Sequence, residues 1–353
     1  MTRKNLTFHL AERHNGNIIP GKTFNLVETD APTADDVKDG QILVENIYLS
    51  LDPAMRTWLY DIRSYVPPVA IGEKMRGGSI ARVLASKSPK AKVGDFVFAR
   101  SGWTEVAVVG EAEFDAIDLP EGARIIDAIG AVGPTGLTAY FGLRDIGKPK
   151  AGETVVVSGA AGATGSVVGQ IAKINGARVI GLAGSDEKCK VLTEELGFDV
   201  ALNYKSPTFA DDFVKATPKY IDVYWDNVGG DILDKALARA AVHSRFVMCG
   251  GISRYNDLAG ENPGIRNLFM VITQRVRMEG FIVFDYRDEY PEAKKQLGQW
   301  LAEGKLKAKE TIVKGGLKVA DAAMSNLFEG GNTGKLLVEV KPIDQDNQSR
   351  SHL

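Results

Sequence analysis

The stretch TVVVSGAAGATGSVVGQIAK at residues 154–173 is predicted to form a strand, a glycine turn and a helix. It opens with an unbroken β-branched run, which is typical of a strand buried on both faces of a parallel sheet. Gly159, Gly162 and Gly165 follow at three-residue spacing, and apolar residues then recur at helical spacing. Turn glycines let the backbone approach a pyrophosphate, and the N–H groups of a helix N-terminus point at the phosphates. The stretch therefore predicts a dinucleotide-binding site rather than a purely structural turn.

The next strand, RVIGLA at residues 178–183, indicates which dinucleotide is bound, because GSDEK follows it at 184–188. An NAD site usually has an acidic residue at this strand end, whereas small residues followed by a cation suit a 2′-phosphate. The two carboxylates are expected in the first turn of a helix at 186–196 that Ser185 N-caps. Lys188 alone would be interpreted as a solvated helix lysine, but in this context it favours NADP(H).

Composition limits the class of protein. The chain has 353 residues, of which 44% are hydrophobic and 25% charged, which suits a globular protein with two separate cores. A net charge of −2 favours neither nucleic acid nor an anionic membrane as a partner. No apolar run approaches a membrane span, and the N-terminus MTRKNLTFHL lacks the apolar core of a signal peptide. A cytoplasmic location is expected.

The counts of cysteine and histidine bear on metal chemistry. The chain has 2 cysteines, Cys189 and Cys249, and 4 histidines, none of them paired at the spacing of zinc ligands. A four-cysteine structural zinc is therefore impossible, no disulfide framework is implied, and a catalytic zinc is not expected. Any redox chemistry must then be organised by a cofactor and by hydrogen bonds from the protein.

The N-terminal part of the chain is predicted to be rich in short strands. Candidate strands punctuated by Gly and Pro lie at 42–49, 78–84, 93–98 and 103–109. Such a pattern is typical of a compact, partly barrel-like β domain. Two later strand-like pieces, at 311–313 and 335–340, are expected to complete this domain.

From about residue 136 strands and helices alternate. Strands are predicted at 154–157, 178–183, 199–204, 221–225, 245–249 and 278–283, and helices at 137–143, 209–216, 231–241 and 291–302. Alternation of this kind predicts an α/β fold with a doubly wound parallel sheet of Rossmann type. The predicted domains are therefore a β-rich catalytic or substrate domain, 1–135 with 305–353, and an NADP(H)-binding domain, 136–304.

Several motifs, in this order and spacing, resemble one known family. They are SGAAGATGSVVGQIAK, AGSDEK, GFDVALNYK, DNVGG, CGGISRYN, RMEGFIV and GNTGK, preceded by YLSLDPAMR, YVPPVAIGEKMRGG and GDFVFARSGW. The chain resembles the zinc-independent medium-chain dehydrogenase/reductase superfamily, and within it the group of prostaglandin reductases, plant double-bond reductases and bacterial curcumin reductases. The resemblance covers nearly the whole chain and implies a GroES-like β-rich domain beside the Rossmann domain.

The resemblance implies NADPH-dependent reduction of carbon–carbon double bonds conjugated to a ketone or aldehyde. Hydride goes to the β-carbon while negative charge builds on the carbonyl oxygen, so a donor placed at that oxygen lowers the barrier. Tyr255 matches the family tyrosine beside the cofactor and is predicted to polarise the oxygen, or to deliver a proton by way of the cofactor's ribose hydroxyl. The alternative is a tyrosine in a surface loop.

By the same resemblance, cofactor contacts are expected in both domains. The pyrophosphate lies against the glycine turn, the 2′-phosphate beside Lys188 and Tyr204, and Asn332 reaches the nicotinamide from the β-rich domain. The full set is Gly162, Ala163, Thr164, Gly165, Lys188, Tyr204, Asn227, Cys249, Gly250, Gly251, Ile252, Ser253, Arg254, Tyr255, Phe281, Ile282, Val283 and Asn332. Several lie at C-terminal strand ends, where open parallel sheets bind ligands. Taken singly, Asn227 could cap a helix, the glycines could form a turn and Phe281 could belong to the core.

The substrate pocket is expected to involve Tyr65, Ala54 and Thr273. Prostaglandin-type members carry a tyrosine where this chain has Thr273, and their DPYMR motif is DPAMR at residues 52–56. Both changes remove bulk and a phenol from the expected pocket, so enone reduction is predicted, and no eicosanoid substrate is claimed. The family also suggests a homodimer through the nucleotide domain, and cyclic dimers are the commonest closed assembly.

Other functions stay open at this stage. A quinone reductase uses the same fold and NADPH. Dehydrogenation of a secondary alcohol is less favoured, because no metal or strong general base is visible to take the hydroxyl proton. A non-catalytic NADPH-binding module is also compatible with the fold. The tripeptide Ser351-His352-Leu353 resembles a variant of the SKL peroxisomal signal, which makes the peroxisome an alternative location.

Overall fold

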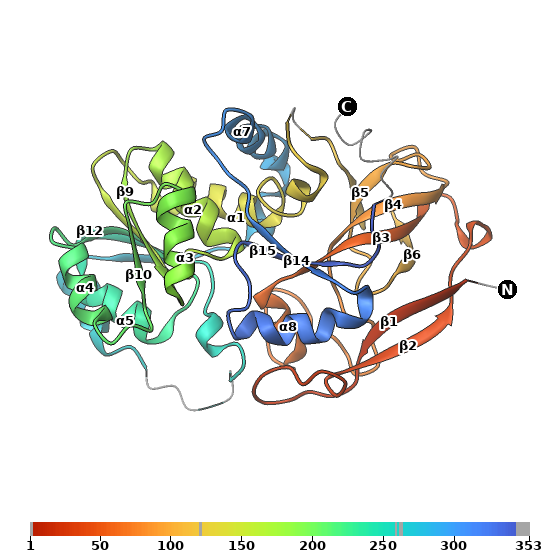
Figure 1. Cartoon of the computed structure of the whole chain (residues 1–353), viewed down its shortest axis with the longest axis horizontal. Helices are drawn as coiled ribbons and strands as arrows, with labels where there is room; N and C mark the ends of the chain where they lie inside the picture. The colour runs from red at the N-terminus through yellow and green to blue at the C-terminus, as the bar shows by residue number, and fades with distance from the viewer. Residues whose placement is uncertain (1–2, 120–121, 258–259, 261–263, 344–353) are drawn as a thin grey trace. The chain divides into compact units, whose positions relative to one another are not determined.

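The computed structural model describes residues 3–119, 122–257, 260 and 264–343 (Figure 1). The chain forms two compact units: the first is Met1–Ile129 with Glu310–Leu353, and the second is Gly130–Lys309. Across the described residues no helix is long and apolar enough to cross a membrane. The tripeptide Ser351-His352-Leu353 lies outside the described residues.

The second unit is built on a six-stranded sheet in the order β10-β9-β8-β11-β12-β13, in which all neighbours run parallel. The strands are β8 (Thr154–Val157), β9 (Arg178–Ala183), β10 (Val200–Asn203), β11 (Ile221–Asp226), β12 (Ala240–Met248) and β13 (Arg277–Gly280). The first strand, β8, is central, and the chain builds outward from it in both directions. The strand order therefore reverses between β8 and β11, which is where doubly wound sheets bind their ligands.

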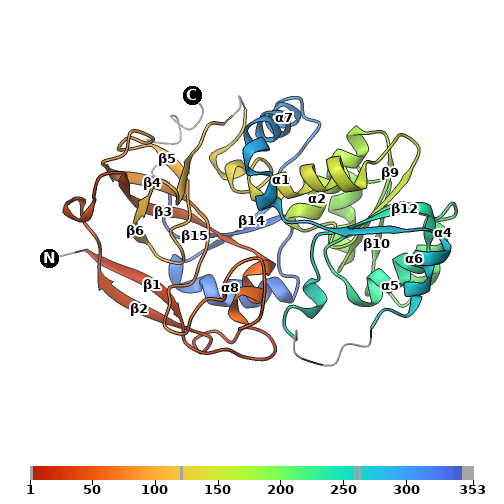
Figure 2. The same ribbon diagram turned by 180° about the vertical axis from the view of Figure 1, so that it is seen from behind.

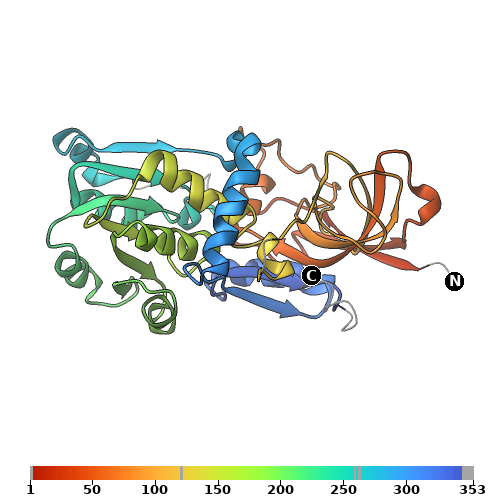
Figure 3. The same cartoon turned by 90° about the horizontal axis from the view of Figure 1, so that it is seen from above.

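Helices cover both faces of this sheet. They are α1 (Pro134–Phe141), α2 (Ala163–Ile174), α3 (Asp186–Lys190), α4 (Phe209–Ala216), α5 (Gly230–Ala238), α6 (Phe269–Thr273) and α7 (Tyr290–Ala302). Short π-helical segments, Gly142–Gly147 and Val191–Glu195, extend α1 and α3. On one face α1 lies beside α2 (Figure 2) and α7 packs against α1 (Figure 3).

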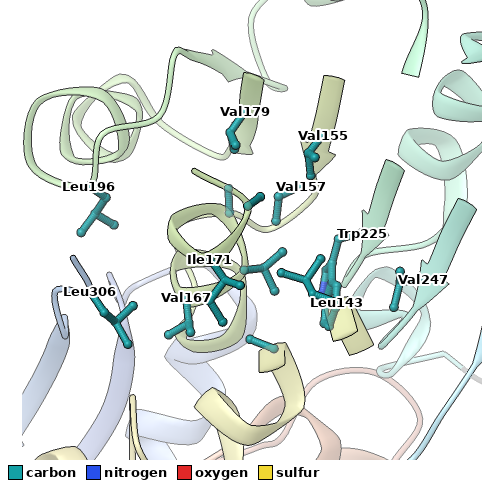
Figure 4. Close-up of a cluster of buried hydrophobic side chains, with 14 of the residues drawn as sticks. Leu143, Val155, Val157, Val167, Ile171, Val179, Leu196, Trp225, Val247 and Leu306 are labelled. Atoms are coloured by element: carbon teal, nitrogen blue, oxygen red, sulfur yellow. The ribbon is translucent and has the colours of Figure 1, made fainter. Parts of the chain in front are cut away.

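The β-branched run of β8 divides its side chains between the two faces. Val155 and Val157 belong to the core under α1, α2 and α7, with Trp225 and Ile171 among their neighbours (Figure 4). Val156 belongs to the opposite core, under α4 and α5. All four residues of β8 are buried, so the prediction of a strand covered on both faces is confirmed.

Several element ends in this unit differ from the prediction. The last strand was expected to reach residue 283, but β13 ends at Gly280, because its partner β12 ends at Met248 and offers no further backbone to pair with. The helix expected at 231–241 ends at Ala238, and β12 begins at Ala240, where it pairs with the start of β11. Phe281 is consequently in a loop beyond the sheet rather than in a strand.

The first unit contains a seven-stranded sheet in the order β14-β15-β3-β4-β5-β7, with β6 paired to β3. The strands are β3 (Gln41–Leu51), β4 (Ser79–Ser86), β5 (Phe96–Ala99), β6 (Val106–Gly110), β7 (Phe114–Ala116), β14 (Glu310–Lys314) and β15 (Lys335–Glu339). Strand β3 is the centre: one edge pairs with β4, and the other pairs with β6 along its first half and β15 along its second. Register shifts between β3 and β4 bend the sheet.

The remaining elements of the first unit complete its core. Strands β1 (Lys4–Leu10) and β2 (Phe24–Asp30) form an antiparallel pair, and helix α8 (Ala320–Phe328) packs against β3 and β15 (Figure 1). Short 3₁₀ helices occur in both units at Ala34–Asp36, Pro53–Leu59, Ile125–Ala128, Ile252–Arg254, Arg266–Leu268, Val283–Glu289 and Leu317–Val319.

Candidate active site

The glycine turn between β8 and α2 favours glycine at two positions, at Gly159 because of its backbone conformation and at Gly165 because of the space available. Gly159 has φ of 57°, in the left-handed region that disfavours side chains. A Cβ at Gly165 would lie 2.4 Å from the carbonyl oxygen of Gly159 and 2.8 Å from the Cα of Ala160. Helix α2 begins at Ala163, with Gly162 as its N-cap. The first turn of α2 thus packs directly on the backbone of the glycine turn, an arrangement typical of a pyrophosphate-binding turn, which is called the cradle below.

The change Gly165→Ala should disrupt this cradle. The added methyl group has no space, so we expect a loss of about 1–3 kcal/mol in stability from overpacking. The same displacement of the turn should weaken NADPH binding about tenfold, measured by fluorescence titration of the cofactor. Gly110→Ala is the matched control, because a Cβ there would meet only an ordinary contact at 3.7 Å. Equal NADPH affinity in both variants would contradict the cradle.

The end of β9 is arranged as the sequence predicts. Ser185 N-caps α3, and its Oγ accepts a hydrogen bond from the backbone N–H of Lys188 at 3.3 Å. Asp186 is the first residue of the helix, and its Oδ1 accepts from Nδ2 of Asn203 at 2.9 Å. The acidic residue is therefore held by the helix start and by β10, rather than standing in the position of an acid that binds a ribose diol.

Two lysines and a tyrosine gather beside this strand end. Burial lowers the pKa of Lys188, and the positive charge of Lys205 lowers it further. The hydroxyl of Tyr204 lies 2.8 Å from the place where a Cβ of Gly184 would stand. A doubly charged phosphate would relieve the repulsion between the two ammonium groups. Lys205 was not predicted, although its position directly after Tyr204 at the end of β10 is the signal that could have found it.

Asn227 lies at the switch point, just after β11. Its Nδ2 donates to the carbonyl oxygen of Ser158 at 2.7 Å, and its Oδ1 accepts from Nε1 of Trp225 at 3.0 Å. The N-cap of the following helix α5 is Gly229, so Asn227 does not cap that helix. These bonds attach Asn227 to the end of β8 and place it beside the glycine turn. A Cβ added at Gly159 would lie 3.4 Å from the Cβ of Asn227.

The loop after β12 folds back on itself, so that Tyr255 contacts the residues at which the loop begins. The Tyr255 hydroxyl accepts a hydrogen bond from the backbone N–H of Gly251 at 3.0 Å. A Cβ at Gly250 would lie 3.1 Å from that hydroxyl, so glycine lets the ring come close. The loop is fastened to the neighbouring turn by Ser253, whose Oγ donates to the carbonyl oxygen of Val228 at 2.6 Å.

Apolar residues precede this loop and follow the neighbouring strand β13. Burial raises the pKa of the Cys249 thiol to about 12, which keeps it protonated at neutral pH. Phe281 packs edge-to-face on Trp225 with 5.9 Å between ring centroids, and the carbonyl oxygen of Val283 accepts from the Tyr290 hydroxyl at 2.9 Å. The predicted nicotinamide-lining residues Phe281, Ile282 and Val283 therefore follow the C-terminal end of β13.

The remaining predicted residues divide between the two units. Tyr65, Ala54 and Asn332 belong to the first unit and Thr273 to the second, so their joint roles remain predictions. Tyr65 accepts a hydrogen bond from Nε1 of Trp58 at 2.9 Å, and desolvation raises the pKa of its hydroxyl. Asn332 donates from Nδ2 to the carbonyl oxygen of Gly334 at 2.7 Å. Thr273 ends α6, where its Oγ1 accepts from Nε2 of Gln274.

Possible metal ligands do not converge in the part of the chain that the structure describes, which holds no group of three or more His, Cys, Asp or Glu suited to an ion. Two family models nevertheless match the chain: the N-terminal domain of oxidoreductases at residues 7–117 and the zinc-binding dehydrogenases at residues 163–299.

Known proteins align with the chain over nearly its full length. It is 40% identical over 347 residues to the NADPH-dependent curcumin reductase of Escherichia coli, covering 97% of this chain and 99% of that protein. It is 40% identical over 304 residues to the NADP(+)-dependent 2-alkenal reductase of Nicotiana tabacum, covering 85% and 87%. The crystal structure of CurA from Vibrio vulnificus in complex with NADPH superposes with a TM-score of 0.89 at 38% identity, covering 96% of this chain and all of that one (100%).

The chain therefore belongs to the medium-chain dehydrogenase/reductase family, with a GroES-like domain and a Rossmann domain. It is an NADP-dependent oxidoreductase. The residues of the second unit are compatible with this cofactor on their own chemistry: the glycine turn has no space for a Cβ at Gly165, and the positive charges of Lys188 and Lys205 act on one another near the end of β9.

Proposed function

We propose that this enzyme reduces the carbon–carbon double bond of α,β-unsaturated ketones and aldehydes. The observation that carries the proposal is the position of the Tyr255 hydroxyl, which accepts from the N–H of Gly251 in a loop fastened to the turn after β11. Supporting it, the relatives that align along the chain are named as curcumin and 2-alkenal reductases. In this proposal the NADP(H)-binding domain is the predicted 136–304, and the catalytic or substrate domain is the predicted 1–135 with 305–353.

The protein's part in the reaction is to stabilise charge. Bound NADPH would supply the hydride that adds to the β-carbon, and the proton that completes the reduction at the α-carbon would come from water or by way of Tyr255 and the cofactor's ribose hydroxyl. As charge moves onto the carbonyl oxygen, the Tyr255 hydroxyl donates a hydrogen bond to it, and the N–H of Gly251, by bonding to the phenolic oxygen, makes that phenol a stronger donor. Asn227 and the loop after β12 hold the surrounding backbone in place through Ser158 and Val228.

At two of the predicted substrate-pocket positions this chain carries small residues where prostaglandin-type members carry tyrosines. Ala54 and Thr273 offer small side chains, and Tyr65, whose pKa is raised by desolvation, keeps its proton at neutral pH. We therefore expect acceptance of small linear enones and enals, with no requirement for a fatty-acid chain.

Turnover of three substrate types under anaerobic conditions tests the proposal. Each is offered with NADPH: a small linear enone, a simple quinone and the corresponding saturated ketone. Formation of the saturated ketone from the enone, identified by mass and NMR, is the expected result. Reduction of the quinone alone would instead assign a quinone reductase, and tight NADPH binding without turnover of any of them would assign a binding module.

A homodimer through the second unit is part of the proposal. Strand β13 is an edge of the parallel sheet, and just before it Leu268, Phe269 and Ile272 are 55%, 68% and 69% exposed. Neighbouring apolar side chains that stay exposed mark association surfaces, and an open strand edge can pair with another chain.

Charge placed on this surface should separate the protomers. The double change Phe269→Lys with Ile272→Lys buries two ammonium groups in the proposed interface, so the dimer should dissociate to monomers by light scattering after size exclusion. Val214→Lys is the control, since Val214 is 50% exposed on α4 and belongs to no proposed interface. An unchanged dimer in the double variant would place the interface elsewhere.

A cytoplasmic location is also proposed. A fluorescently tagged chain with and without Ser351-His352-Leu353 tests the peroxisomal alternative, because a working signal would move the protein into peroxisomes only when the tripeptide is present.

A further inference from the structure

We propose that Asp226 is a positioning residue that holds three loops of the cofactor site in one arrangement. The three loops are the glycine turn after β8, the turn after β11 and the loop after β12. The inference rests on the NADP(H) site described above, but it does not depend on which substrate is reduced.

One oxygen of the Asp226 carboxyl accepts hydrogen bonds from four donors. Its Oδ1 accepts from the Ser158 hydroxyl at 2.9 Å and from the Tyr224 hydroxyl at 3.1 Å. It also accepts from the backbone N–H groups of Val228 at 3.1 Å and Gly229 at 3.0 Å. The Ser158 bond crosses from β11 to the end of β8, and the two backbone bonds close the turn that carries Asn227.

The main chain of Asp226 reaches the third loop. Its carbonyl oxygen accepts from the N–H of Cys249 at 2.9 Å and from the N–H of Gly250 at 3.0 Å. These bonds fix the start of the segment that ends in Tyr255. Ser158 closes the set on the other side, because its Oγ accepts from the N–H of Asn227 at 2.9 Å. Asp226 is thus bonded to all three of these loops.

The setting of the carboxyl is unusual for a surface turn. Asp226 is 0% exposed, and its Oδ2 has no hydrogen-bond partner among the described residues. Burial raises the pKa of Asp226 against the opposing effect of its donors. An aspartate exposed to solvent could hold a single turn equally well. Burying Asp226 without a partner for its Oδ2 therefore carries a desolvation cost that a role in one turn alone would not require. That cost is consistent with a residue retained for the geometry of the site.

Four variants of the full chain separate positioning from general support of the core. Asp226→Ala and Ser158→Ala remove the link between loops and should raise the NADPH Kd about tenfold and about fivefold, measured by fluorescence titration without substrate. Asp226→Asn keeps a carbonyl oxygen for the same four donors and should stay within about threefold of wild type. Tyr224→Phe removes a donor to the same oxygen from a fully buried strand residue, and should lower Tm while the NADPH Kd changes less than about twofold.

Hydrogen exchange supplies a second readout. In Asp226→Ala and Ser158→Ala, peptides covering residues 158–165, 226–230 and 249–255 should all exchange faster than in wild type. If these variants lower Tm as Tyr224→Phe does while the NADPH Kd stays within about twofold, the carboxyl merely supports the core and the inference is wrong. Should Asp226→Ala fail to fold, Ser158→Ala and Asp226→Asn still decide. Because Kd is measured without substrate, failure of enone turnover in wild type would refute the proposed function alone.

Discussion

Replacing Tyr255 by phenylalanine is expected to lower kcat for a small enone about 100-fold. The enolate-like oxygen loses a hydrogen-bond donor, and removal of one such donor typically has an effect of this size. The hydrogen bond from the Gly251 N–H is lost too, but its net contribution to stability is small. The Kd for NADPH should therefore change less than about threefold. Steady-state kinetics at saturating NADPH, together with a direct titration of the cofactor, measure both quantities.

Tyr220→Phe is the matched control for this change. Tyr220 is 48% exposed and directly precedes β11, at the end of the strand opposite the ligand-binding edge, so its hydroxyl should not matter for turnover. Full activity in Tyr255→Phe would remove the role assigned to the phenol. Equal losses of activity in both variants would point to a general effect of losing a hydroxyl.

Replacing Lys188 by glutamine is expected to raise KM for NADPH about 30-fold and to leave the constants for NADH almost unchanged. The reason is that a charge-assisted bond to the 2′-phosphate is lost, and NADH has no such phosphate. Since burial and Lys205 lower the pKa of Lys188, the ammonium loses its proton at a lower pH than an ordinary lysine. Affinity of the wild type for NADPH should therefore fall as pH rises through that lowered pKa, whereas affinity for NADH should not.

Lys190→Gln provides the comparison within the same helix. Lys190 is exposed, and it ends the helix that Ser185 begins. Its loss should leave the preference for NADPH over NADH in place. If Lys190→Gln and Lys188→Gln weakened NADPH equally, the effect would come from the general positive charge of the helix, and the assignment of Lys188 would fail.

Much of the second unit was predictable because its residues act locally. The run of β8, the glycines after it and the Ser185 cap each determine structure within a few residues, and the structure shows all three as expected. The position of Asn227 was also predictable, since the end of a parallel strand fixes it. Its bonds to Ser158 and Trp225 were not, because they depend on which strands become neighbours.

Asp226 shows why part of the site could not be predicted from the sequence. Nothing in DNVGG distinguishes a buried carboxyl with four donors from an ordinary turn aspartate, since the donors come from residues up to 68 positions away. In the first unit, by contrast, α8 was missed although its signal is local: Ala320, Ala323, Met324 and Leu327 are buried at helical spacing. Strand β2 had no such signal, because six of its seven residues are exposed.

The most direct test of enone reduction follows the hydride. The wild-type enzyme is given a small linear enone and NADPH carrying deuterium at the transferred position of the nicotinamide, and the product is examined by NMR. The expected product is a saturated ketone with one deuterium at the carbon β to the carbonyl. Deuterium at the carbonyl carbon, in an allylic alcohol, would contradict enone reduction and assign the enzyme to carbonyl reduction.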